Sequence, residues 1–256
     1  MISIKNKNEI ELMRMAGKIT AAVLDEISKH IKPGISTLEL DKIANMFIIN
    51  KGAKPAFLRY NGFPSTICTS IDDVVVHGIP SADMILEEGQ IIGIDVGVKY
   101  HGYCGDAART FAVGTISEDK QKLLRVTKEC FFEAIKDLKE GSRIGDIGAN
   151  IQRHCEKFGF KPVTSMGGHG IGKSVHEDPF IPNYGMAGTG DKLKAGMVIA
   201  IEPMINMGTS DTKISGWKCQ TSDGLPSAHY ENTVLIQTEG VEILTKTADL
   251  EAYNLE

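Results

Sequence analysis

Several features that mark other classes of protein are absent from this sequence of 256 residues. Its cysteines are odd in number and form no C-x-x-C pair, which argues against a disulfide framework and a zinc finger. No apolar run is long enough to span a bilayer, and the first residues contain no signal-peptide core. We therefore expect a cytoplasmic protein with reduced thiols and no membrane partner.

An excess of charge of either sign is also missing. The chain has 28 Lys and Arg residues against 33 Asp and Glu residues, a formal net charge of −5. This mildly acidic balance argues against a nucleic-acid binder that works by neutralising phosphates. Apolar residues make up 42% and charged residues 24%, which is ordinary for a globular protein and argues against disorder. We expect one catalytic domain over residues 1–256.

The spacing of apolar residues predicts helices and strands that recur in the same order. Helices are expected at residues 8–30, 36–52, 117–138 and 144–158, with Asn8, Ser36 and Ser117 as N-terminal caps. Ser36 and Glu39 form a capping-box pattern. Strands are expected at residues 67–70, 74–76, 90–98, 107–113, 197–205, 231–236 and 241–244. Residues 99–102 predict a hairpin turn between two of them.

The recurrence extends to the sequence itself. Residues 86–95 (LEEGQIIGID) match residues 193–202 (LKAGMVIAIE) at a spacing of 107, and Gly34 matches Gly141 at the same spacing. Residues 76–80 match residues 175–179 at a spacing of 99, which indicates an insertion near residues 185–190. The chain therefore consists of two related halves, roughly 8–113 and 117–236. A cleft between such halves is a common place for a functional site.

The repeat places acidic residues inside apolar strands, where charges are rarely buried unless they are paired or bound to a metal. Asp95 and Glu202 occupy matching positions, and Asp106 is expected nearly opposite Asp95 across the hairpin. Glu231 begins a further strand, and His169 lies in a glycine-rich loop. Four converging carboxylates would repel one another, and two divalent cations would neutralise them. Oxygen ligands with one imidazole suit Mn, Fe, Co or Zn, and two such ions form a hydrolytic centre.

One motif points to a different chemistry. Residues 167–174 (GGHGIGKS) satisfy the phosphate-loop pattern G-x-x-x-x-G-K-S. A phosphate loop leads directly into a helix whose N-terminus holds the phosphates. Pro179 and Pro182 follow too closely for a long helix, so we interpret the match as accidental.

Seven short motifs, in order along the whole chain, resemble those of the type I methionine aminopeptidases, a family with the pita-bread fold. The motifs are residues 76–80 (VHGIP), 94–97 (IDVG), 105–106 (GD), 167–172 (GGHGIG), 175–179 (VHEDP), 200–204 (AIEPM) and 227–233 (SAHYENT). The resemblance implies an α+β fold in which a central antiparallel sheet is backed by helices in two pseudo-symmetric halves. It also implies hydrolysis of the N-terminal initiator methionine from nascent proteins with a small second residue, by a metal-bridged hydroxide.

The same resemblance implies a role for each candidate residue. The implied ligands of two metal ions are Asp95, Asp106, His169, Glu202 and Glu231, with Asp106 and Glu231 bridging. His77 and His176 are implied to contact the substrate amide and the tetrahedral intermediate, and Glu202 to move a proton. The implied methionine pocket consists of Phe57, Tyr60, Phe63, Cys68, Val175 and Trp217, together with the two histidines. Such apolar, polarizable surfaces suit a thioether, although aromatic residues alone would indicate only core packing.

Two positions depart from the family pattern. Some relatives have a threonine in place of Gly97 and an aromatic residue in place of Val175. The first departure leaves open how the ligands are oriented, and the second leaves open what forms the pocket wall.

Two alternative functions share the fold. An X-Pro aminopeptidase or dipeptidase has the same ligand set, but those enzymes carry a large N-terminal domain, and 94 residues precede Asp95 here. A non-catalytic pita-bread protein-binding module would have lost metal ligands, whereas all five are present. We expect a monomer that acts on nascent polypeptide N-termini, with the ribosome as a further partner and no direct contact with nucleic acid.

Overall fold

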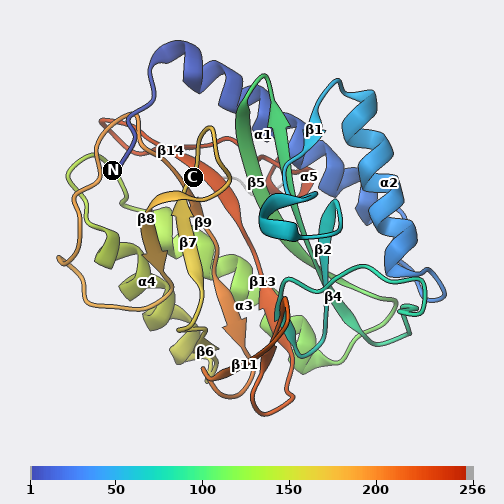
Figure 1. Cartoon of the computed structure of the whole chain (residues 1–256). Coiled ribbons are helices and arrows are strands. Elements are labelled where there is room, and N and C mark those ends of the chain that lie inside the picture. The colour runs from blue at the N-terminus through green and yellow to red at the C-terminus, as the bar shows by residue number, and fades with distance from the viewer. Residues whose placement is uncertain (1, 252–256) are drawn as a thin grey trace.

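Two antiparallel sheets, one from each half of the chain, form the centre of the molecule (Figure 1). The computed structural model describes residues 2–251. The first half contains α1 (Lys7–Ser28), α2 (Thr37–Asn50), β1 (Lys54–Pro55), a 3₁₀ turn (Tyr60–Gly62), β2 (Ile67–Ile71), β3 (Val74–Val76), β4 (Ile91–Tyr100) and β5 (Tyr103–Ala112). In the central sheet of this half, β4 pairs with β5 along one edge, and with β2 and then β1 along the other edge.

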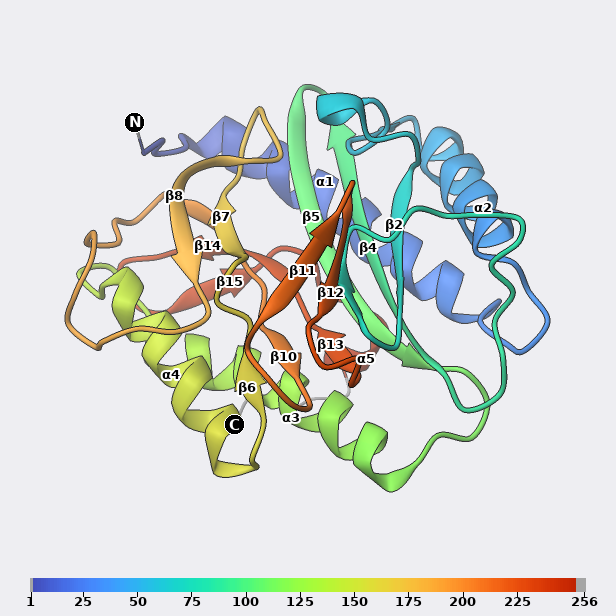
Figure 2. The same cartoon turned by 60° about the horizontal axis from the view of Figure 1, so that its bottom comes forward.

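The second half begins with two helices and continues with short strands. Its elements are α3 (Glu118–Ile135), α4 (Ile144–Lys157), β6 (Lys161–Pro162), β7 (Gly167–Gly170), β8 (Glu177–Pro182), β9 (Val198–Ile201), β10 (Met204–Asn206), β11 (Thr212–Ser215), β12 (Lys218–Thr221), β13 (Ser227–His229), β14 (Asn232–Ile236), β15 (Val241–Ile243) and α5 (Ala248–Glu251). Its central sheet has the order β15-β14-β9-β7-β8. Two three-stranded sheets, β13-β10-β6 and β11-β12-β3, complete the fold. Figure 2 shows the β11–β12 hairpin in front of the junction between the halves.

The two central sheets are joined where β5 meets β14. The amide of Asp106 donates to Oγ1 of Thr233, and that hydroxyl donates to the carbonyl of Asp106. The amide of Glu231 donates to the carbonyl of Ala108 at 2.9 Å. These bonds place the end of one half's sheet directly against the other. The predicted α+β class with antiparallel strands in two pseudo-symmetric halves is confirmed.

The halves share hydrogen bonds at the spacing found in the sequence. The amide of Gly34 donates to Leu86, and the amide of Gly141, 107 residues later, donates to Leu193. Both glycines have positive φ, 92° and 91°, a conformation that disfavours other residues. Each glycine therefore allows the turn after the first helix of its half to hydrogen-bond to the segment that precedes the central strand, β4 or β9.

Most predicted elements lie within a few residues of their expected bounds. The Ser36–Glu39 capping box and the Ser117 cap are confirmed. The Asn8 cap is wrong, because Asn6 caps α1 and forms a capping box with Glu9, three residues after it.

Two other boundaries also differ. The strand expected at residues 197–205 divides into β9 and β10, because Pro203 has no amide hydrogen to continue the ladder. The hairpin turn narrows to His101 and Gly102, with φ of 44° and 90°, as a two-residue turn of primed type requires.

No disulfide or membrane-spanning helix occurs in the part of the chain that is described. All five cysteines, Cys68, Cys104, Cys130, Cys155 and Cys219, are free and buried. No helix among residues 2–251 is both long enough and apolar enough to cross a bilayer. The expected domain also included residues 1 and 252–256, which lie outside the described residues.

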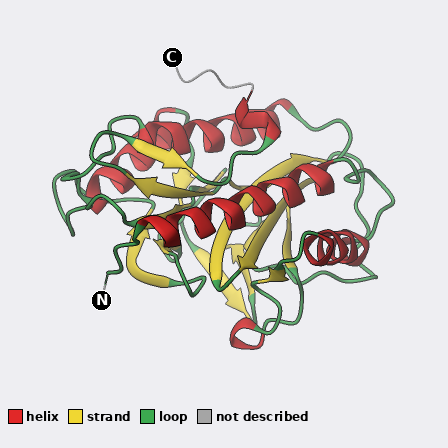
Figure 3. Ribbon diagram, turned by 90° about the horizontal axis from the view of Figure 1, so that it is seen from above, coloured by secondary structure: helices red, strands yellow, loops and turns green. Residues whose placement is uncertain are grey.

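The long helix α1 crosses the strands of the first half, as the view from above shows (Figure 3). A Cβ atom on Gly105 of β5 would lie 2.8 Å from the amide nitrogen of Gly17, in the middle of α1. A Cβ atom on Gly17 would lie 2.5 Å from the carbonyl oxygen of Leu244. The helix therefore touches the backbone of both halves through a position that has no side chain.

The sign of the change in the free energy of unfolding caused by Gly17→Ala tests this contact. Helix propensity alone predicts that Gly17→Ala stabilises the protein by about 1 kcal/mol. We expect the clash with Leu244 to dominate, so that the free energy of unfolding falls by about 1–3 kcal/mol. Urea denaturation followed by circular dichroism measures the change. Lys18→Ala, an exposed neighbour, is the control, with an expected change within about 0.5 kcal/mol. A more stable Gly17→Ala protein would contradict the close approach.

Candidate active site

Five predicted ligands from five separate strand segments line one cavity at the junction of the halves. Asp95 lies on β4, Asp106 on β5 and His169 on β7, while Glu202 directly follows β9 and Glu231 directly precedes β14. Asp106 pairs with Gly97, and Asp95 pairs with Ala108. The two aspartates are thus diagonal neighbours on one face of the hairpin, two residues out of register, in agreement with the near opposition expected from the sequence.

The side chains of this cluster approach one another closely. One ligand atom from each of Asp106, His169 and Glu231 lies within 4.8 Å of the others. Nε2 of His169 is 3.6 Å from Oε1 of Glu202 and 3.8 Å from Oδ2 of Asp106. Nδ1 of His169 lies 2.9 Å from the carbonyl oxygen of Gly170, which can only accept a hydrogen bond. Nδ1 therefore donates to this carbonyl, which leaves Nε2 facing the carboxylates.

Burial changes the pKa values of these acids. Burial raises the pKa of Asp95 to about 7. Burial, followed by repulsion from neighbouring carboxylates, raises the pKa values of Asp106 and Glu231 well above their usual range. Burial also raises the pKa of Glu202, but the imidazoles of His229, His169 and His176 outweigh this effect and hold it below its usual range. Full ionisation of the three acids with raised pKa values at neutral pH would therefore require positive charge beside them.

The residues fit divalent cations. Oδ1 of Asp95, Oδ1 of Asp106 and Oε1 of Glu231 are buried and accept no hydrogen bond from any described residue. Orphaned buried oxygens on three acids are costly unless a cation takes their lone pairs. Carboxylate oxygens with one imidazole nitrogen form a donor set typical of first-row transition metals.

His229 belongs to this cluster although we did not predict a role for it. Its Nε2 is 3.4 Å from Oε2 of Glu202 and 4.0 Å from Oε2 of Glu231, and only 4% of the side chain is exposed. The signal in the sequence was its spacing, because a residue two positions before Glu231 in an extended segment projects to the same side.

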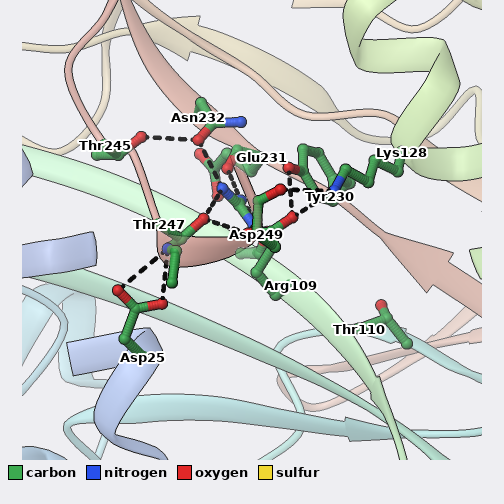
Figure 4. Close-up of polar contacts among 12 residues, drawn as sticks. Asp25, Arg109, Thr110, Lys128, Tyr230, Glu231, Asn232, Thr245, Thr247 and Asp249 are labelled. Carbon is green, nitrogen blue, oxygen red and sulfur yellow. Dashed lines mark hydrogen bonds and ion pairs between the residues drawn. The ribbon is translucent and has the colours of Figure 1, made fainter. Parts of the chain in front are cut away.

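Arg109 is a second residue without a predicted role, and it holds the backbone of Glu231 from the other face of β5. Its Nη1 donates to the carbonyls of Ala108 and Glu231, at 2.8 and 2.6 Å. Nη2 donates to Asn232 and to Thr247, and the guanidinium lies 3.9 Å from the ring centroid of Tyr230. Figure 4 shows how these contacts gather around the guanidinium. The backbone of Glu231 is therefore held by the buried Arg109 guanidinium as well as by its amide's hydrogen bond to Ala108.

His169 projects from a strand, so the glycine-rich loop expected there is wrong for residues 167–170. A Cβ atom on Gly168 would lie 2.2 Å from the carbonyl oxygen of Ala200, and one on Gly170 would lie 2.0 Å from that of Asp178. Glycine on both sides of His169 thus lets β7 pack tightly between β8 and β9. Strand β8 follows in place of a helix, so the interpretation of the phosphate-loop match as accidental is confirmed.

The cavity of about 110 Å³ also has an apolar wall. That wall is formed by Phe57, Tyr60, Phe63, Cys68 and Trp217, with Asn61 and Val76 as further lining residues. Val175 is buried in the same apolar cluster but does not line the cavity. The ring of Trp217, at the mouth, lies edge-on to Phe63 with centroids 5.4 Å apart.

Two histidines lie between the acidic cluster and the apolar wall. His77 has a left-handed backbone (φ 62°), which is rare for a side-chain-bearing residue and aims the ring into the cavity. Nδ1 of His176 is 3.2 Å from the hydroxyl of Tyr60, and its ring is 4.3 Å from that of His169. Burial lowers the pKa of His77, and burial together with the neighbouring His169 imidazole lowers the pKa of His176 to about 4. Both imidazoles are neutral at pH 7.

Residues 11–238 match the sequence model of metallopeptidase family M24. The chain belongs to metallopeptidase family M24. It is 52% identical over 247 residues to a methionine aminopeptidase of Clostridium acetobutylicum, which covers 96% of this chain and 99% of that protein.

Solved M24 structures agree with this assignment. The methionine aminopeptidase of Thermotoga maritima superposes with a TM-score of 0.95 at 43% identity, over 96% of this chain and all of that one. A prolidase of Pyrococcus furiosus superposes with a TM-score of 0.77 at 27% identity, and the match covers 95% of this chain but only 65% of the prolidase. The predicted pita-bread fold is confirmed.

The acidic cluster predicts a strong response of this M24 protein to metal. After treatment with a chelator, addition of Mn²⁺ at 100 times its dissociation constant should stabilise the fold by about 2.7 kcal/mol, measured by thermal melting. Asp106→Asn should lose most of this response, because it removes a charge from the centre of the cluster. The exposed Asp83→Asn is the matched control and should respond as the wild type does. Equal responses in both variants would place the metal elsewhere.

Proposed function

We propose that this chain removes the initiator methionine from nascent proteins whose second residue is small, using two divalent cations. The observation that carries this proposal is one cavity lined on one side by four carboxylates and an imidazole, and on the other by aromatic and thiol side chains. A peptide bond held between these sides would have its carbonyl at the charged cluster and an apolar side chain in the pocket.

The five ligands would hold the cations, which we expect to be Co, Mn, Fe or Zn. Asp95, Asp106 and Glu231 have oxygens free to do so, and His169 directs its Nε2 to the same place. When bound, the cations supply positive charge that polarises the scissile carbonyl and lowers the pKa of water. Asp106 and Glu231, the most deeply buried acids of the cluster, are suited to be shared between both cations.

Glu202 is the proton carrier in this proposal. Its pKa is held below the usual range by three imidazoles, so it is ionised at neutral pH and able to accept a proton. It would take that proton from the attacking water and return it to the leaving amine. Nε2 of His229, 3.4 Å from Oε2, would attract this carboxylate and favour its position for both transfers.

His77 and His176 would bind the peptide group as neutral hydrogen-bonding groups. Since their pKa values are lowered, they add no charge that would compete with the cations. The hydroxyl of Tyr60 fixes the orientation of the His176 ring. Both rings would bind the oxygen that becomes negative in the tetrahedral intermediate.

The apolar wall would bind the methionine side chain. Phe57, Phe63, Cys68 and Trp217 present polarizable surfaces that favour a thioether. Val175 would support this wall from behind. The partners implied are nascent polypeptide N-termini, with the ribosome nearby and a cytoplasmic location, and we propose that the protein acts as a monomer.

A peptide panel distinguishes the candidate functions. A purified, metal-loaded sample is incubated with Met-Gly-Xaa, Met-Ile-Xaa and Xaa-Pro peptides, with and without chelator, and products are measured by mass spectrometry. We expect cleavage of Met-Gly-Xaa alone, lost on chelation and restored by Co, Mn or Fe. Cleavage of Xaa-Pro would favour the dipeptidase alternative, and no cleavage of any peptide would favour a protein-binding module. Full turnover by a sample that elemental analysis finds free of metal would overturn the mechanism.

Glu202→Gln tests the proton carrier. The variant keeps the shape and one oxygen donor but removes the charge, and general-base assistance is worth about 10²–10⁴-fold in rate. We expect kcat to fall by at least about 100-fold, with near-normal folding because the remaining carboxylates repel less. Thermal melting and kcat are measured on the same metal-loaded preparation. A variant that melts far below the wild type yet keeps near-normal kcat would show that Glu202 is only structural.

A further inference from the structure

Phe57 lies directly against Gly97, at a point where β4 passes the cavity. Gly97 is two residues after Asp95 on β4, so both face the same side of the sheet. A Cβ atom at residue 97 would lie 2.5 Å from Cε1 and 2.9 Å from Cδ1 of Phe57. Real Cβ atoms do not approach so closely, so the ring occupies the space that a side chain at residue 97 would need.

The backbone on which Phe57 is mounted is tied to the same strand. The amide of Ala56 donates to the carbonyl of Gly97 at 2.8 Å, and β1 pairs Pro55 with Val98. The Cβ atom of Ala56 would itself lie 3.1 Å from a Cβ atom at residue 97. The chain beside Gly97 therefore cannot retreat, and only the ring of Phe57 is able to move.

The ring has one free direction. Phe57 is 8% exposed and lines the cavity, while its remaining surroundings are a packed cluster that includes Phe63, Cys68 and Val175. A side chain at residue 97 would push the ring into the cavity, where the substrate side chain is proposed to bind.

We propose that Gly97 is a specificity-determining residue. Because it leaves room for the ring of Phe57, it determines the length of the unbranched substrate side chain that the pocket accepts. This inference rests on the proposed function. It also accounts for both departures from the family pattern. Gly97 makes room for the ring, and Phe57 forms the wall in front of the small side chain of Val175.

The test compares three peptides that differ only in the N-terminal side chain. Norvaline is one atom shorter than methionine, and ethionine is one methylene longer. One methylene in an apolar pocket changes kcat/KM by about 10–200-fold. For Gly97→Ala we therefore expect the ratio of kcat/KM for methionine to that for norvaline to fall about tenfold. For Phe57→Leu we expect the ratio for ethionine to that for methionine to rise about tenfold.

Two further variants identify the cause. Gly97→Ala combined with Phe57→Leu should have the methionine-to-norvaline ratio of Phe57→Leu alone, within about twofold, because the clashing ring atoms are gone. Gly93→Ala is the matched control, since it lies on the same face of β4 and its Cβ would make only an ordinary contact, 3.5 Å from Cβ of Ser70. It should leave every ratio unchanged.

The outcomes separate this inference from the proposed function. A wild-type protein that cleaves none of the three peptides contradicts the proposed function. A wild-type protein that cleaves methionine peptides, with ratios unaltered in Gly97→Ala and Phe57→Leu, overturns the inference alone. If melting shows that Gly97→Ala does not fold, Phe57→Leu decides the matter, because an unchanged ethionine ratio would exclude Phe57 as the limiting wall.

Discussion

Like-charged carboxylates buried at the junction of two half-structures are the constraint on which the rest of the molecule depends. Asp95 and Asp106 come from the first half, and Glu202 and Glu231 come from the second. Neither half holds the complete set, so the site exists only where the two sheets meet. Burial, together with repulsion from neighbouring carboxylates, raises the pKa values of Asp95, Asp106 and Glu231, so an apolar junction would be more stable than this one without cations. The fold therefore gathers carboxylate oxygens at one place at the expense of some stability.

Much of the scaffold serves to hold those oxygens still. Arg109 donates a hydrogen bond to the backbone carbonyl of Glu231, and Thr233 of β14 donates one to the backbone carbonyl of Asp106. His229 and His169 lie on either side of the Glu202 carboxylate. Glycine residues allow the strands around the site to pack closely against one another, as Gly168 and Gly170 do on either side of His169. A site that binds cations in a fixed geometry requires such support beyond the ligands themselves.

The sequence predicted the fold and the convergence of the four acids with His169, because both depend on local patterns. Acids inside apolar strands and a repeat at constant spacing are visible without coordinates, and family motifs extend them. It did not predict the role of Arg109 or the packing of Phe57 against Gly97, since both depend on which residues meet across the fold. Asn8 has a side chain typical of a cap, but Asn6 forms a capping box with Glu9, three residues after it, and begins the helix two residues earlier. Glycines around His169 indicated a loop, whereas in the folded protein they permit strand packing.

A crystal structure of the protein grown with Mn²⁺, with anomalous diffraction used to locate the metal, tests the proposed metal centre directly. We expect two anomalous peaks within coordination distance of Asp95, Asp106, His169, Glu202 and Glu231, with Asp106 and Glu231 contacting both. Peaks confined to other residues, or an empty cluster in crystals of protein that is active and free of metal in solution, would contradict it.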